Sequence, residues 1–166
     1  MWAVDVRRRC DDRRMLRFPP WVTDGLVAGT VAGLASTLPS ALAGARSSGD
    51  PWASRRAAGN LVLPATAPGP VLLAAGIALS VADALNWGVV LARWLDRTHP
   101  VIHGAGAGVG LVAFRYGVVG RRRPLIRALP PLPQVVDSVV FGMVAGAVLS
   151  RRRRQPILDP AMRRGG

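Results

Sequence analysis

The sequence predicts an all-α fold, a polytopic bundle of transmembrane helices with probably four spans. Half of the residues are hydrophobic, yet the formal net charge is +13. The apolar and charged residues are segregated, because long uncharged stretches alternate with short arginine-rich ones. In a soluble helix or strand these residues interleave to give a wet face, whereas a membrane span needs an apolar run of ~20 residues. The pattern therefore indicates a chain that uses lipid as a solvent.

The expected spans lie near residues 23–45, 71–94, 101–120 and 134–150. In the first, no charge occurs from Gly25 to Ala45, and Pro39 should kink or end the helix near its far side. The fourth is short, so it needs a thin bilayer or flanking residues that extend it. These limits leave residues 1–22 as a polar, arginine-rich segment and 151–166 as a basic tail.

The second apolar stretch, residues 57–92, is too long for one straight crossing. Three prolines divide it at positions 64, 68 and 70. We expect residues 57–68 to form a short interfacial or re-entrant piece after a polar loop over 46–60. A proline-rich linker over 128–133 should precede the fourth span.

The arginine distribution predicts that both termini are cytoplasmic in a bacterial cytoplasmic (inner) membrane, although Arg121–Arg123 oppose this orientation. The run Arg151–Arg154 follows an apolar stretch directly. It should therefore anchor the chain to anionic lipid headgroups and not to nucleic acid. An alternative stays open for residues 1–43, which resemble a cleaved secretory signal with an A-x-A pattern at residues 41–43.

Catalytic, cofactor and metal signatures do not occur in the sequence. Cys10 is the single cysteine, which excludes an internal disulfide and a CxxC site. The chain contains arginine but no lysine. His99 and His103 are spaced like metal ligands on a helix, but Pro100 between them disfavours that site. His103 is better interpreted as a packing hydrogen bond or a titrating group near the interface. We expect no enzyme activity.

Glycines four residues apart mark three of the expected spans. They are Gly25, Gly29 and Gly33; Gly104 with Gly108 and Gly106 with Gly110; and Gly142 with Gly146. Glycines at this spacing share a helix face and let two backbones approach closely, which drives helix association in lipid. They favour ordinary packing inside one bundle, with homo-oligomer formation or association with a larger membrane complex as the functional alternative.

A polar set occupies one face of the second span. Ser80, Asp83 and Trp87 share that face, Asn86 lies beside it, and Asp83 is near the midpoint. A carboxylate at that depth costs several kcal/mol unless it is neutralised or paired, so it should face the bundle interior. These residues, with His103, are the candidate intramembrane polar site. Asp83 would either couple to a proton or cation, or join helices through hydrogen bonds.

Trp21, Trp87 and Trp94 also suit interfacial belts.

Arg115 and Asp137 form a candidate structural ion pair between the third and fourth spans. Both would lie near the outer surface, where a salt bridge would neutralise them; alternatively, Arg115 reaches the headgroups by itself. Two function classes follow from these observations, and the glycine-rich, weakly polar interior favours the first. The first is a structural or accessory membrane protein that associates through its glycine faces. The second is a small proton- or cation-coupled transporter or channel that uses Asp83.

Overall fold

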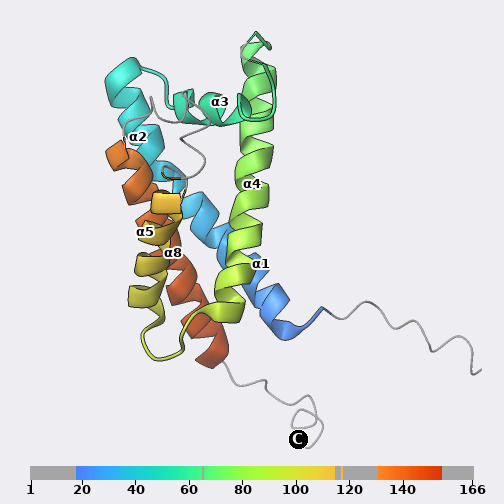
Figure 1. Cartoon of the computed structure of the whole chain (residues 1–166), viewed down its shortest axis with the longest axis vertical. Coiled ribbons are helices and arrows are strands. Elements are labelled where there is room, and N and C mark those ends of the chain that lie inside the picture. Colours follow the sequence, from blue (N-terminus) through green and yellow to red (C-terminus); the bar gives the residue numbers. More distant parts are fainter. Residues whose placement is uncertain (1–17, 65, 115–116, 118–130, 155–166) are drawn as a thin grey trace, which may run out of the picture.

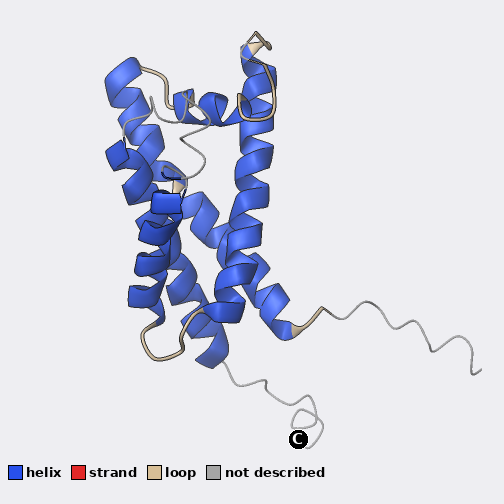
Figure 2. Ribbon diagram, in the orientation of Figure 1, coloured by secondary structure: helices blue, strands red, loops and turns tan. Residues whose placement is uncertain are grey.

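A computed structural model describes residues 18–64, 66–114, 117 and 131–154, and this part of the chain is helical without strands (Figure 2). The expected all-α bundle is confirmed. The helices are α1 (Pro20–Ala35), α2 (Thr37–Ser48), α3 (Ala53–Gly59), α4 (Gly69–Trp94), α5 (Pro100–Phe114) and α8 (Pro131–Arg154). The sequence predictions for Cys10, Arg115 and the arginines at 121–123 lie outside the described residues.

Three segments of the described chain are long and apolar enough to cross a membrane: Pro20–Arg46, Gly69–Trp94 and Pro131–Arg154. The helix α5 is apolar but shorter, with 15 residues up to Phe114. The expected fourth span, residues 134–150, lies inside α8, which flanking residues extend at both ends to 24 residues. Pro131 and Pro133 belong to its first turn, where a backbone N–H has no acceptor inside the helix and proline is tolerated.

The first span contains a break between α1 and α2. Ser36 closes α1 with its N–H bonded to the Ala32 carbonyl, and α2 begins at Thr37. The cause lies at Pro39, whose ring clashes with the carbonyl four residues earlier and which lacks an N–H. The kink thus lies on the N-terminal side of the proline, and it leaves backbone groups without helical partners in mid-span.

The region expected as a polar loop over 46–60 is mostly helical. The helix α2 continues to Ser48 and ends at Gly49, whose φ of 69° is in the left-handed region that favours glycine. A turn with the Trp52 N–H bonded to Asp50 then starts α3, where Arg56 forms a salt bridge to Asp50. In Figure 1, α3 lies across one end of the bundle between α2 and α4.

Two helix pairs, joined by α1 against α8, make the bundle (Figure 1). In the first pair, α1 packs on α4 so closely that a Cβ on Gly25 would lie 2.6 Å from Cα of Val89. In the second, α5 packs on α8, with Gly104 against Gly142. The buried core joins the pairs near one end: Ala28, Ala32, Leu91, Ala92, Leu95, Phe141, Ala145 and Leu149.

Salt bridges and helix caps close this same end of the bundle. Arg152 near the end of α8 binds Asp24 of α1, with Nε and Oδ1 2.6 Å apart. Arg153 donates from Nη2 to the carbonyl oxygen of Ala92 at 2.8 Å, so a cation lies at the C-terminus of α4. The residues Arg151–Arg154, expected as the start of a tail, are the last turn of α8. The start of α1 and the end of α8 therefore lie on the same side.

Candidate intramembrane polar pocket

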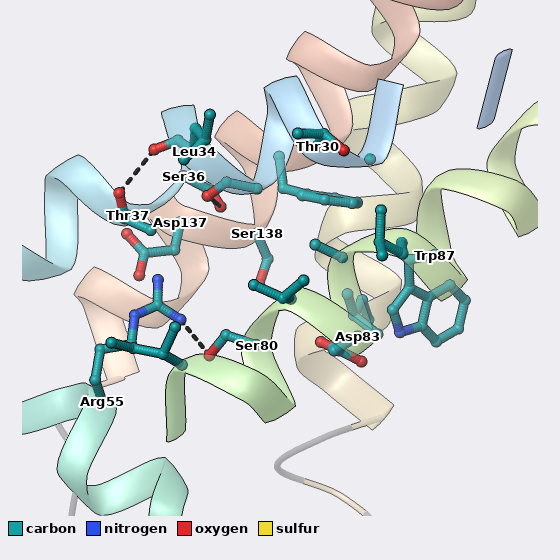
Figure 3. A pocket seen from close by; sticks show the side chains of 18 of the residues that line it. Thr30, Leu34, Ser36, Thr37, Arg55, Ser80, Asp83, Trp87, Asp137 and Ser138 are labelled. Atoms are coloured by element: carbon teal, nitrogen blue, oxygen red, sulfur yellow. Dashed lines mark hydrogen bonds between the residues drawn. The ribbon is translucent and has the colours of Figure 1, made fainter. Parts of the chain in front are cut away.

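A cavity of about 420 Å³ opens where α4 diverges from α1 and α8. Residues of α1, α2, α3, α4, α5 and α8 line it, and Figure 3 shows side chains of this lining from close by. Its polar lining consists of Thr30, Ser36, Thr37, Arg55, Ser80, Asp83, Gln134, Asp137 and Ser138. The volume is in the range of small-molecule sites, and the rest of the lining is largely apolar, as is typical of such sites.

The glycines of α3 and α4 bring Arg55 into this cavity. Gly59 packs on the backbone of Leu72, and a Cβ on Gly76 would overlap the carbonyl of Arg55. Because neither glycine has a side chain, α3 lies directly on α4 near the N-terminal end of α4. The Arg55 side chain then extends into the cavity and donates from Nη1 to the Ser80 hydroxyl, which itself donates to the Gly76 carbonyl at 2.7 Å.

Asp137 reaches the cavity from α8 and stabilises the break in the first span. Its Oδ1 accepts a hydrogen bond from the Ser40 backbone N–H at 3.0 Å. That N–H is in the first turn of α2, where a break in the helix leaves donors without carbonyl partners and where the helix dipole favours a negative charge. A carboxylate on α8 thus binds a backbone N–H in the first turn of α2, close to the break.

Arg55 and Asp137 face each other on one side of the cavity, as Figure 3 shows. Burial lowers the pKa of the Arg55 guanidinium from its ordinary value, and the negative charge of Asp137 opposes that shift. The two groups therefore stabilise each other's charged forms in a region where single charges are costly. Together with Ser80, they link α3, α4 and α8.

Asp83 lies beside Trp87 on the same face of α4, and both line the cavity. Figure 3 shows this pair away from Arg55. The structure thus brings Ser80, Asp83 and Trp87 together, as their spacing on one helix face predicts. Trp87 is partly buried and packs against the core, whereas Trp94 is 80% exposed near the end of α4.

Two residues of the predicted polar site lie elsewhere. Asn86 is exposed on α4 and is not part of the cavity lining. His103 lies in the first turn of α5, with Nδ1 3.4 Å from Asp96 Oδ2 and its ring 6.2 Å from that of His99. Hydrogen bonds from Thr98 lower the pKa of Asp96. No group of three metal-binding side chains occurs among the described residues.

The ion pair expected between Arg115 and Asp137 cannot be followed to Arg115, which is outside the described residues. Within them, Asp137 contacts Ser40 and faces Arg55. Sequence reasoning missed Arg55 as a site residue, because it lies in a polar segment and looks like an ordinary loop charge. A usable signal was present: Gly59 follows Arg55 by four residues and would let that helix face approach a neighbour.

The glycine faces are occupied by contacts within the chain. Gly25, Gly29 and Gly33 approach α4; Gly104 and Gly108 approach α8; Gly142 and Gly146 approach α5. Gly106 and Gly110 differ, because a Cβ on either would have no atom within 4 Å. The packing surfaces thus hold the bundle together and leave one glycine pair of α5 on the outside.

The cavity combines a guanidinium, two carboxylates, hydroxyl groups and an indole ring inside an apolar bundle. Such an arrangement can bind a small polar or charged solute and can exchange a proton at a carboxylate. It lacks an obvious pairing of a nucleophile with a base among the described lining residues. No protein family model, curated protein or solved structure matches the chain.

Proposed function

We propose that this chain is a small integral membrane protein that binds a solute in the cavity and couples its movement to a proton or cation at Asp83. The observation that carries this proposal is the grouping of Arg55, Ser80, Asp83 and Asp137 around one cavity between apolar helices. Charged side chains within a membrane are costly, so they are concentrated on substrate and ion pathways.

The competing accessory role receives less support from the packing. That role needs glycine faces that are open to a partner, and most of the predicted glycines contact other helices of the same chain. The open pair Gly106 and Gly110 is a much smaller surface. Transport through the polar cavity therefore uses more of the features that distinguish this bundle.

Flux in liposomes tests the proposal. Purified protein is reconstituted with a pH-sensitive dye inside the vesicles, and a potassium diffusion potential drives proton entry. We expect Asp83→Asn to reduce protein-dependent proton flux at least tenfold, because the amide cannot exchange a proton. The matched control is Asp96→Asn, which makes the same chemical change at an exposed residue outside the cavity. Equal flux in Asp83→Asn and wild type, or no flux in either, would contradict the proposal.

We also propose that the protein resides in a bacterial cytoplasmic membrane with the shared end of α1 and α8 on the cytoplasmic side. The support is the concentration of arginine at that end, where Arg93, Arg97 and Arg151–Arg154 lie. Arg152 and Arg153 have protein partners there, which leaves exposed Arg151 and Arg154 to face anionic headgroups.

Reporter fusions test the orientation directly. Phosphatase fused after residue 50 or 127 should be active, and a cytoplasmic fluorescent reporter should be active after residue 97 or 160. The positive-inside bias supplies the physical reason, because arginines near span ends are retained in the cytoplasm. The reverse pattern of activities would overturn the orientation, and activity of both reporters at one site would argue for two orientations of the chain.

A further inference from the structure

We propose that the solute bound in this cavity is an amphipathic organic cation, with its ammonium group at Asp83 and Trp87 and its apolar part along α1 and α4. The inference deepens the proposed function and rests on the same cavity, but it concerns binding and can be tested without transport. Three features of the cavity support it: the pairing of a carboxylate with an indole, the charge balance of the lining, and the apolar mouth.

The first feature is the neighbouring placement of Asp83 and Trp87. They are four residues apart on α4, so their side chains lie on one face, one turn apart, and both line the cavity. A carboxylate supplies the charge that attracts an ammonium, and the face of a tryptophan ring is the strongest aromatic partner for a cation. Figure 3 shows the two side chains together at the end of the cavity away from Arg55.

The second feature is the charge balance. Among the described lining residues, the carboxylates of Asp83 and Asp137 outnumber the guanidinium of Arg55 by two to one. Arg55 is engaged inside the protein by Ser80 and by the charge of Asp137. A positively charged ligand therefore complements this lining, whereas an anion would have to compete with Asp137 for Arg55. A bound cation would add to the contacts that Asp83 already makes.

The third feature is the apolar mouth. Leu34 on α1 and Ile77 and Val81 on α4 line the cavity, and they are 69%, 42% and 53% exposed. In a bundle that spans a membrane, these side chains face lipid, so the cavity opens sideways towards the acyl chains. A ligand with an apolar body can enter from the bilayer and leave its charged group at the polar floor. This access route favours an amphipathic cation over a small hydrated metal ion.

Binding of benzyltrimethylammonium to the purified full chain in detergent, measured by calorimetry, tests the inference. Two probes of similar size separate charge from shape: neopentylbenzene, in which a carbon replaces the nitrogen, and phenylacetate, which carries the opposite charge. We expect the cation to bind at least tenfold more tightly than either probe, since only the cation gains from the carboxylate and the indole.

Variants assign the binding to the proposed groups. Asp83→Asn should weaken cation binding at least tenfold, Trp87→Leu about tenfold, and Trp87→Phe less than Trp87→Leu, because phenylalanine retains an aromatic face. Asp96→Asn should bind like wild type. Far-ultraviolet circular dichroism and gel filtration of each variant establish that the bundle is intact, and Trp87→Phe keeps the test valid if Trp87→Leu does not fold.

The outcomes discriminate between this inference and the proposed function. Absence of cation binding, equal binding of the neutral probe or the anion, or unchanged binding by Asp83→Asn would overturn the inference. Cation binding that depends on Asp83 without any proton flux would support the inference and contradict the transport proposal. Proton flux that depends on Asp83, without cation binding, would support transport and overturn the cation as its ligand.

Discussion

Gly104→Ala is expected to destabilise the bundle strongly, whereas Gly106→Ala, two residues away on the same helix, is expected to leave it intact. A Cβ on Gly104 would lie 2.9 Å from the carbonyl carbon of Gly142, and closer to its oxygen. Real Cβ atoms essentially never approach other atoms so closely. Both neighbours are backbone atoms, so the helices α5 and α8 would have to move apart.

The expected magnitude follows from two opposing effects. Overpacking of this kind costs about 3 kcal/mol, and replacing a helical glycine by alanine recovers about 1 kcal/mol of helix propensity. The net loss for Gly104→Ala is therefore about 2 kcal/mol. Gly106→Ala has only the favourable effect, because a Cβ there meets no atom within 4 Å.

Denaturant titration of both variants in detergent micelles, followed by circular dichroism and gel filtration, measures the difference. The pair is informative because the residue type, the helix and the chemical change are identical, and only the facing surface differs. If both variants lose stability equally, glycine flexibility and not close packing governs α5. If Gly106→Ala alone loses stability, the face of α5 assigned to α8 is wrong.

Asp137→Asn is the second substitution with a large expected effect. The asparagine side chain can still accept the hydrogen bond from Ser40 through its oxygen, so the substitution removes the charge and preserves the helix cap. The guanidinium of half-buried Arg55 then loses the carboxylate that faces it. Removing one member of a fully buried pair costs about 3–5 kcal/mol, and partial exposure of Arg55 reduces the expected loss to about 2 kcal/mol.

A double-mutant cycle with Arg55→Gln separates the ion pair from the other contacts of these residues. We expect the double variant Arg55→Gln/Asp137→Asn to be more stable than Asp137→Asn, because it leaves no uncompensated charge. Denaturant titration in micelles gives the free energy of unfolding for all four proteins. Strict additivity of the two single effects would show that Arg55 and Asp137 do not interact.

The helices themselves were predictable from the sequence because membrane spans have a strong local signature. Uncharged stretches, arginine runs and prolines located three long apolar segments within a few residues, and Pro39 predicted the kink in the first one. The loop expected over 46–60 is mostly helical, and part of the linker expected over 128–133 belongs to α8. Pro131 and Pro133 look like linker residues, but the first turn of a helix needs no donor at those positions, so α8 is longer than its apolar stretch.

The candidate site was predictable only where its residues share one helix. Ser80, Asp83 and Trp87 are spaced to lie on one face, and this local periodicity is fixed by 3.6 residues per turn. The proximity of Arg55 and Asp137 could not be predicted in this way, because they lie on different helices. Their proximity depends on α3 folding back over α4 and on the kink that exposes the Ser40 N–H to α8.

The sequence by itself determined that this protein is a helical bundle with long apolar segments, and it placed one carboxylate at the middle of the second. These properties follow from composition and spacing along single helices. Only the tertiary structure decided which glycines pack within the chain, which remain open, and which charges share a cavity. Such choices depend on contacts between segments far apart in the sequence, where side-chain volume and the neutralisation of buried charge, and not local periodicity, select the arrangement.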